Sequence, residues 1–156
     1  MNFIKVLLIV AIAFPLQSLA ASIQKNDLYG QWRCNYIFGS QIQNLKANIT
    51  YNININKNGT NQGKGTILFS LIGLPELKYQ ETDTGTWALQ ENELKVVSTS
   101  LQFKNISHPE LDQFLNLQNN LPRKINEILD IVKLTKETMT VQSKRHNKTY
   151  TCKKAS

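Results

Sequence analysis

The stretch at residues 27–36 reads DLYGQWRCNY. It carries Gly30 and Trp32 in the spacing G-x-W, followed by Cys34. A tryptophan can bury a large apolar surface in a core, and a glycine lets the neighbouring backbone approach closely. The other cysteine, Cys152, lies near the end of the sequence. We therefore interpret residues 27–36 as the first strand of a small β-barrel that the last strand closes.

Residues 1–20 have the three-part pattern of a secretory signal peptide. Lys5 provides the positive charge, and residues 6–14 form the apolar segment. Ser18 and Ala20 place small residues just before the expected cleavage point. The apolar run is too short to span a bilayer comfortably, and no cysteine follows it as one would in a bacterial lipoprotein. We expect cleavage after Ala20, export to the periplasm or the cell exterior, and no transmembrane segment in the remaining chain.

The remaining residues, 21–156, suffice for one domain with a real hydrophobic core. Two cysteines in an exported chain predict one disulfide, between Cys34 and Cys152. Such a bond requires the first and last strands to be neighbours, as they are in a closed up-and-down barrel. On the chain-entropy model, a loop of this length stabilises the fold by roughly 4–5 kcal/mol.

The chain is basic, with 18 Lys and Arg against 11 Asp and Glu and a net charge of +7. Loss of Lys5 with the leader reduces the net charge to +6. Such a surface favours anionic partners such as phospholipid head groups, lipopolysaccharide or acidic proteins. Scattered basic residues also fit an ordinary solvated surface. One basic group lies in a predicted hairpin turn and is a candidate anion contact: Lys144, Arg145, His146 and Lys148.

The clearest periodic signal is at residues 45–56, where apolar and polar residues alternate. A period of two predicts a half-buried strand. The dipeptide Asn58-Gly59 then gives a strong hairpin signal, and Gly63 and Gly65 are expected to lengthen or kink the turn. A further strand is predicted at 67–72, and we expect it to be buried on both faces or packed under another segment. The remaining predicted strands lie around 77–79 and at 84–89, 94–99, 138–143 and 148–152. The pattern predicts an all-β fold of eight or nine antiparallel strands.

Residues 107–131 interrupt the strands with a helical pattern. Ser107 and Glu110 have the spacing of a capping box, which marks the start of a helix. A second helix is predicted over 122–131, where apolar residues recur at i, i+3, i+4 and i+7. One face of the first predicted helix, a candidate lid or partner surface, carries Leu111, Phe114 and Leu115.

Five short segments follow one another in an order known from small barrels: residues 28–32, 58–60, 84–94, 134–140 and 148–151. Together they resemble the small bacterial domains of the lipocalin-like, or calycin, superfamily. The resemblance implies an antiparallel up-and-down barrel. The second tryptophan repeats the G-x-W spacing, so both pairs are expected to pack at a barrel end: Gly30 with Trp32, and Gly85 with Trp87.

Two features depart from that family. The helical segment falls where a lipocalin has a simple turn, and the last strand offers only Lys153 and Lys154 as partners for Trp32. The chain also resembles periplasmic inhibitors of C-type lysozyme, which join an early and a late strand by a disulfide. A chain of charge +6 is a poor electrostatic match for a basic enzyme, so this second resemblance ranks lower.

No catalytic motif is present in the sequence. His108 and His146 are the only histidines, and both lie in predicted loops. Motifs for serine hydrolases, zinc proteases, redox dithiols and phosphate-binding loops are missing. No group of His, Cys, Asp or Glu has metal-ligand spacing. We expect a protein that is not an enzyme and has no metal or cofactor.

Two functional classes remain. The first is a binding protein that carries or senses a small apolar or anionic ligand inside the barrel, although a filled core is an equally good interpretation. The second is a periplasmic interaction module, such as an inhibitor, an immunity protein or an envelope-assembly factor, that uses the insertion and loops. Export argues against nucleic acid as a partner. The candidate lining residues are Tyr51, Ile53, Phe69, Tyr79, Trp87 and Phe103.

Overall fold

The computed structural model describes residues 23–40, 45–70, 72–115 and 121–155, so the predicted signal peptide lies outside the described residues. Eight strands of this part close into an antiparallel barrel. The strands are β1 (Gly30–Ser40), β2 (Leu45–Ile55), β3 (Thr60–Ser70), β4 (Leu77–Gln90), β5 (Glu93–Asn105), β6 (Asn126–Leu134), β7 (Thr138–Ser143) and β8 (Lys148–Lys154). Short helices accompany them: α1 (Lys25–Leu28), the 3-10 helix η1 (Pro109–Leu111) and α2 (Asp112–Leu115).

Each strand pairs with its neighbour in the sequence, and β8 returns to pair with β1. The predicted all-β, up-and-down barrel is therefore confirmed. None of the described helices is long and apolar enough to cross a membrane.

Closure depends on a short stretch of pairing and one covalent bond. Only three residues of β1, from Trp32 to Cys34, pair with β8. Within that stretch Cys34 lies directly opposite Cys152, and the two form the predicted disulfide. The bond joins positions 118 residues apart, so it encloses nearly the whole barrel.

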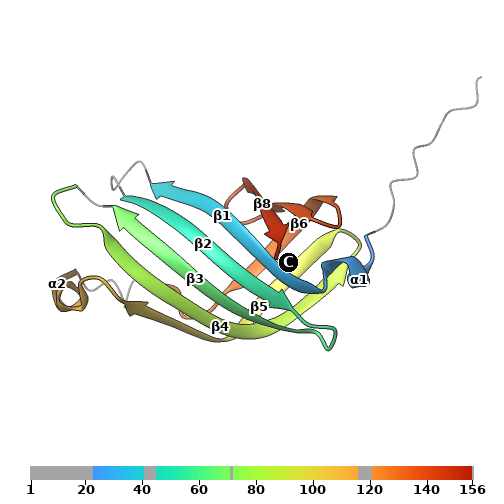
Figure 1. Ribbon diagram of the computed structural model, residues 1–156, viewed down its shortest axis with the longest axis horizontal. Coiled ribbons are helices and arrows are strands. Elements are labelled where there is room, and N and C mark those ends of the chain that lie inside the picture. The colour runs from blue at the N-terminus through green and yellow to red at the C-terminus, as the bar shows by residue number, and fades with distance from the viewer. Residues whose placement is uncertain (1–22, 41–44, 71, 116–120, 156) are drawn as a thin grey trace, which may run out of the picture.

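The strands are unequal in length, and this shapes the barrel. Strands β1–β5 have 11 to 14 residues, whereas β6–β8 have 6 to 9. Figure 1 shows β1–β5 along the long axis, with β6 and β8 toward the end where α1 lies. Strand β5 pairs with β6 only over its first five residues. The part of the barrel toward α2 is therefore walled mainly by the five long strands.

Two apolar clusters fill opposite ends of the barrel. The α1-end core is built around Trp32, Ile55, Leu94, Val141 and the disulfide. The α2-end core consists of Ala47, Ile67, Phe69, Leu77 and Tyr79. Inward and outward positions alternate along the strands, as the buried and exposed residues of β4 show most clearly. This alternation is what period-two patterning specifies.

The hairpin at residues 55–60 forms where Asn58-Gly59 predicted it. Gly59 has a positive φ of 80°, which glycine adopts without strain. The expected effect of Gly63 and Gly65 on the turn is wrong, because both lie inside β3 and pair with β2 and β4.

The run at 67–72 also differs from its prediction. Strand β3 ends at Ser70, and its residues alternate between buried and half-buried. Ile72 lies beyond the strand and is 81% exposed.

The helical insertion is much shorter than predicted. Among the described residues of the insertion, which leave out 116–120, helical structure is confined to η1 and α2, and β6 occupies most of the segment expected to be a second helix over 122–131. Its apolar residues satisfy a helical pattern as well as a strand pattern, but β-branched side chains favour strands. Pairing with β5 and β7 decides between the two. The capping box does not form, because His108 is the N-cap of η1 and makes no side-chain cap bond.

Candidate functional site

Both G-x-W pairs lie at the α1 end of the barrel. Trp32 is fully buried, and its indole N–H donates a hydrogen bond to the carbonyl of Leu28, 2.7 Å away, in α1. The ammonium of Lys154 lies 4.9 Å from the centre of the Trp32 ring. Of the two lysines that the sequence offered as partners, the structure selects this one.

The second tryptophan secures the β2–β3 turn. Trp87 donates from its indole N–H to the carbonyl of Asn56 at 2.9 Å, and its ring meets that of Tyr29 edge to face. Gly85, two residues earlier, sits at a β-bulge between β4 and β5. A Cβ atom there would lie 2.3 Å from the carbonyl oxygen of Val97, so the close approach of the backbones requires glycine.

The predicted lining residues divide between the two ends of the barrel. Ile53 and Trp87 belong to the α1-end core, against which Tyr51 packs. At the other end, Phe69 and Tyr79 belong to the α2-end core, and Phe103 packs against it. The middle of the barrel between these clusters therefore has a different lining.

That lining is polar, and the sequence analysis did not single it out. We call it the interior polar belt. It brings together inward-facing residues of five strands: Tyr36 on β1, Tyr51 on β2, Glu81 and Asp83 on β4, Glu127 on β6 and Tyr150 on β8.

Tyr51 and Asp83 form one part of the belt. The Tyr51 hydroxyl donates to one carboxylate oxygen of Asp83, and the amide of Asn61 lies 3.5 Å from the other. Burial and the bond to Asp83 raise the pKa of Tyr51 above its ordinary range. Burial also raises the pKa of Asp83, while the bond from Tyr51 opposes that rise.

Two glycines of β3 make room for this pair. A Cβ atom at Gly63 would lie 1.8 Å from the Tyr51 hydroxyl oxygen and 2.1 Å from a carboxylate oxygen of Asp83. At Gly65 it would lie 3.0 Å from the Tyr51 ring and 3.3 Å from a carboxylate oxygen of Glu81. The glycines are therefore part of the belt's construction.

Glu81 is the most isolated charge in the belt. It is only 6% exposed, and its carboxylate has no hydrogen-bond partner among the described residues. Burial, and to a lesser extent the charge of Asp83, raises the pKa of Glu81 to about 7.

Two tyrosines face these carboxyl groups. The rings of Tyr36 and Tyr150 stack with centroids 4.8 Å apart. Burial raises both pKa values, and the charge of Glu127 raises them further. In the closed order of eight strands, β4 lies half-way round the barrel from β8, so the stacked pair and β4 face each other across the interior. The charge of Glu81 accordingly contributes to the raised pKa of Tyr36.

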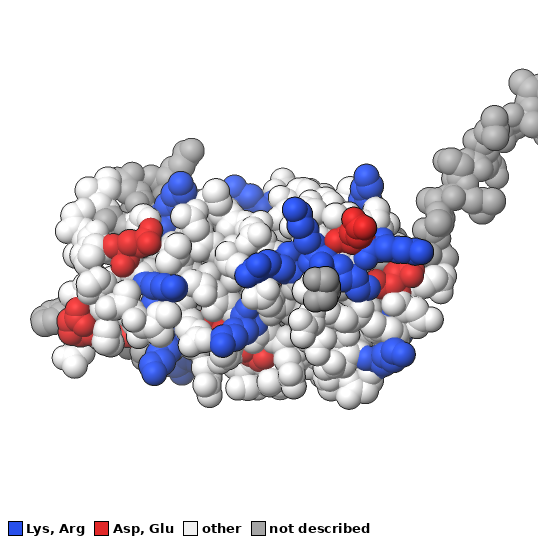
Figure 2. Space-filling model, in the orientation of Figure 1, with Lys and Arg blue, Asp and Glu red and all other residues white. Residues whose placement is uncertain are grey.

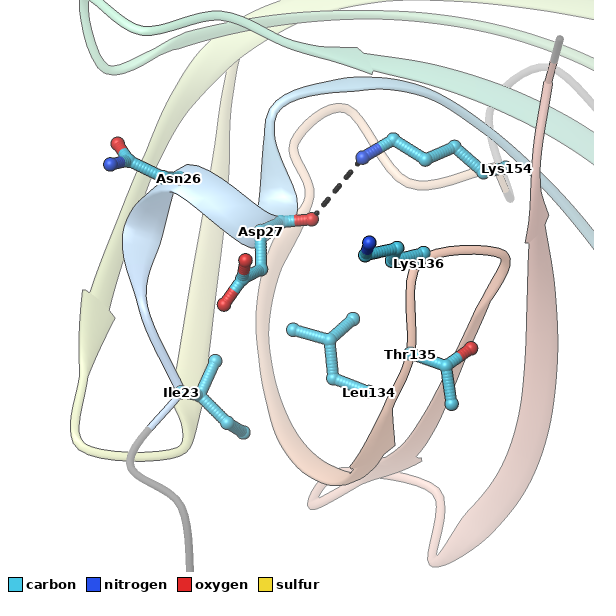
Figure 3. A pocket seen from close by; sticks show the side chains of 7 residues that line it. All are labelled: Ile23, Asn26, Asp27, Leu134, Thr135, Lys136 and Lys154. Carbon is cyan, nitrogen blue, oxygen red and sulfur yellow. Dashed lines mark hydrogen bonds between the residues drawn. The ribbon is translucent and has the colours of Figure 1, made fainter.

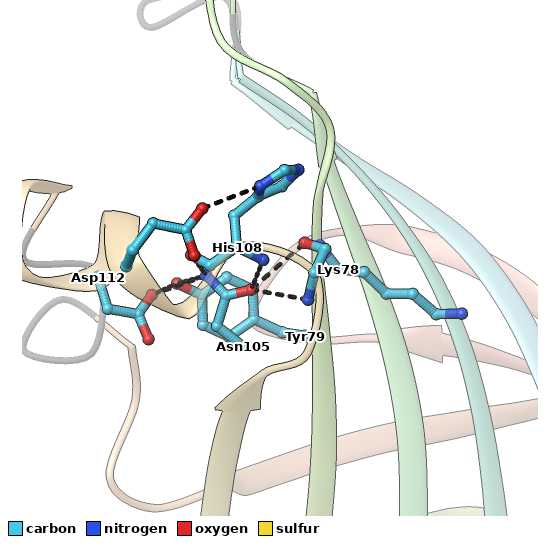
Figure 4. A network of polar contacts seen from close by, with 7 residues as sticks. Lys78, Tyr79, Asn105, His108 and Asp112 are labelled. Carbon is cyan, nitrogen blue, oxygen red and sulfur yellow. Dashed lines mark hydrogen bonds and ion pairs between the residues drawn. The ribbon is translucent and has the colours of Figure 1, made fainter.

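A polar network fixes the predicted lid at the α2 end (Figure 4). The Asn105 amide donates to the His108 carbonyl at 2.7 Å and to the Asp112 carboxylate at 2.9 Å. Its carbonyl oxygen accepts from the backbone N–H of His108 at 3.0 Å. The Tyr79 hydroxyl donates to Asp112. Asn105 thereby ties η1 and α2 to β4 and β5.

Of the three residues predicted to form a lid, the structure describes the side chain of only one, Leu111. Leu111, together with Leu121 beyond α2, packs against the α2-end core. Phe114 and Leu115 lie in α2, but their side chains fall outside the described part of the structure. Their role as a lid or partner face stays a prediction.

The basic hairpin tip is less available to an anion than the sequence suggests. Lys144 pairs with Glu93 and lies 3.4 Å from Asp130, so two carboxylates already engage it. Arg145 and His146 are exposed in the same turn, and Lys148 is exposed at the start of β8. An anion-binding role for these three stays a prediction.

A surface hollow of about 380 Å³ lies beside α1, between that helix and the β6–β7 turn (Figure 3). The Lys154 ammonium crosses it to the carbonyl of Asp27 at 3.3 Å. The described residues include no group of three or more His, Cys, Asp or Glu that could hold a metal ion.

The chain matches no known family model, and no curated protein is similar to it. The structure itself defines the class as an eight-stranded, closed, antiparallel up-and-down barrel.

Proposed function

We propose that this chain is an exported, non-enzymatic binding protein that holds a small ligand inside its barrel. Kinship with lipocalin-like proteins is part of the proposal, and it rests on the G-x-W pairs and the order of the strands.

One observation carries the proposal: inward-facing side chains in the middle of the barrel keep accessible surface. Tyr36, Tyr51 and Tyr150 are half-buried, whereas Trp32 and Val141 in the α1-end core are fully buried. A filled core would bury both groups to a similar degree. Barrels of eight strands are just wide enough to enclose one small ligand.

Native mass spectrometry of the protein, secreted with its own leader and purified without detergent, tests this proposal. We expect a non-covalent adduct of small mass that disappears on denaturation. A bare chain, combined with no thermal shift across a library of small molecules, would remove the ligand-binding function.

The second candidate function is interaction with another protein, and a group of exposed apolar residues at one end of the barrel favours it. Ile72 and Leu74, in the loop between β3 and β4, are 81% and 37% exposed, and Ile106 after β5 is 46% exposed. The backbone N–H of Ile106 donates to the carbonyl of Lys78 at the start of β4, so these apolar side chains flank the same end of the barrel. Exposed apolar groups often mark interaction sites. Crosslinking from position 72 in the native host, with one stoichiometric protein captured and no small adduct found, would favour this candidate.

A further inference from the structure

Charge is segregated between the outside and the inside of the barrel. Every Lys and Arg in the described strands is exposed except Lys154, which lies at the α1 end. Figure 2 shows more basic than acidic side chains on one face of the molecule. The interior polar belt, by contrast, holds three carboxyl groups and no cation: Glu81, Asp83 and Glu127. The net charge of the chain therefore says nothing about what the interior binds.

Glu81 gives a reason to place a ligand there. Within the described part of the chain, the only fully enclosed side-chain polar atom without a hydrogen bond is Oδ1 of Asn61. The carboxylate of Glu81 also lacks a hydrogen bond, so its oxygens must border open space inside the barrel. A buried carboxylate without a partner is unfavourable, and a cation is the partner that relieves it best. The unpaired oxygen of Asn61, beside Asp83, adds negative potential to the same region.

The aromatic groups suit the same kind of ligand. Tyr36 on β1 and Tyr150 on β8 stack with each other, and these two neighbouring strands lie across the barrel from β4. Aromatic faces attract ammonium groups, most strongly where water is excluded. The phenols stay uncharged at physiological pH, since their pKa values are raised.

We propose that the barrel binds an organic cation, an ammonium group on an apolar body, with the ammonium held between Glu81, Asp83 and the stacked Tyr36–Tyr150 pair. This inference rests on the proposed function and names the chemistry of its ligand. It reverses the expectation of an anionic ligand, because an anion in this space would face three carboxyl groups.

The apolar body of the ligand fits toward α2 rather than α1. Ile49 and Phe103 pack against the α2-end core but remain half-buried. Leu101, which lies opposite Asp83 on β5, is half-buried as well. The α1-end core is more completely closed, since Trp32, Ile55 and Leu94 are at most 2% exposed. Contact with the half-buried residues would add hydrophobic stabilisation to the charge pairing.

A matched series of head groups tests the inference. Octylamine, octanol and octanoate share one apolar chain and differ in charge, and their affinities can be measured by titration calorimetry at pH 8, where Glu81 is ionised. We expect octylamine to bind roughly tenfold or more tightly than octanol, and octanoate to bind most weakly. Glu81→Gln keeps the shape of the side chain, removes its charge, and should greatly reduce the preference for the amine, which Asp83 alone then supports. Glu137→Gln is the control, because Glu137 is exposed in the β6–β7 turn.

The outcomes separate the two proposals. Equal binding of the three compounds, or tighter binding of octanoate, overturns the cation inference and leaves a ligand-binding barrel. Equal effects of Glu81→Gln and Glu137→Gln also overturn it. If none of the compounds binds, the inference fails, and a bare native mass spectrum would remove the proposed function as well. Circular dichroism of each variant verifies that it is folded.

Discussion

The ring of Tyr51 occupies space that two glycines leave open, and this makes a sharp residue-scale prediction. Gly63→Ala would place a methyl group on the Tyr51 hydroxyl and the Asp83 carboxylate. Because the core must shift to admit it, we expect the free energy of unfolding to fall by about 1–3 kcal/mol. Urea denaturation measures the loss.

A double-mutant cycle identifies the cause. In a Tyr51→Ala background the ring is absent, so Gly63→Ala should cost much less than in the natural chain. An equal cost in both backgrounds would show that the loss comes from the β3 backbone and not from the close approach of Tyr51.

Glu81 makes the stability of the barrel depend on pH. Its folded-state pKa of about 7 exceeds its ordinary value of 4.5, so the folded protein holds this proton more tightly than the unfolded chain does. Stability therefore falls as pH rises from about 4.5 to about 7, by up to about 3 kcal/mol. Asp83 acts in the same direction, since burial raises its pKa too.

The measurement is thermal unfolding of the natural chain and Glu81→Gln from pH 4 to pH 8. We expect the variant to be the more stable at pH 8 and the difference to shrink toward zero near pH 4. A constant difference across this range would mean that Glu81 titrates normally in the folded barrel.

The sequence contained a signal for the interior belt. Glu81 and Asp83 occupy the same alternating positions of β4 as Leu77 and Tyr79, and the side chains at these positions point inward. Polar residues on a strand usually point to solvent. Periodicity alone therefore does not show whether Glu81 and Asp83 face the interior or lie in a part of the strand that is no longer in the core. The meeting of Tyr36 with Tyr150 depends on barrel closure, which no local pattern encodes.

At the scale of elements, β6 shows that a sequence pattern alone does not always distinguish a strand from a helix. Its residues fit a helix when read alone, and only the ladders to β5 and β7 decide that they form a strand. The hairpins were predictable because Asn58-Gly59 and strict alternation are local signals. The sequence also predicted a helix where η1 and α2 lie, but it did not predict that Asn105, a side chain outside them, holds them in place.

Asn105 offers a test of that attachment. Asn105→Ala removes the donors to His108 and Asp112 and the acceptor for the backbone of His108. Since the half-buried partners lose these bonds, we expect a loss of about 1–3 kcal/mol in the free energy of unfolding and faster amide hydrogen exchange over residues 106–113. Asn52→Ala, at an exposed position on β2, is the control. Unchanged exchange in the Asn105 variant would show that packing of Leu111 alone fixes the segment.

At the scale of the whole molecule, the barrel combines a basic exterior with an acidic interior. The basic exterior could be predicted from the composition, since charged residues seldom lie inside a fold. The acidic interior could not be predicted in this way, because the carboxyl groups of Glu81 and Asp83 on β4 and of Glu127 on β6 face one enclosed interior only after the barrel closes. The one long-range contact that the sequence did specify is the disulfide, and it is also the bond on which closure depends most.

Removal of the disulfide should weaken the whole barrel rather than one end of it. Cys34→Ser with Cys152→Ser frees a loop of 118 residues, and we expect the free energy of unfolding to fall by roughly 4–5 kcal/mol on the chain-entropy model. Because β1 and β8 pair over only three residues, the remaining hydrogen bonds cannot compensate for this loss. Urea denaturation followed by both tryptophan fluorescence and far-ultraviolet circular dichroism should give one shared, lowered midpoint. If instead only the tryptophan signal shifted, the α1 end would be opening alone, and the disulfide would secure that end and not the closure of the barrel.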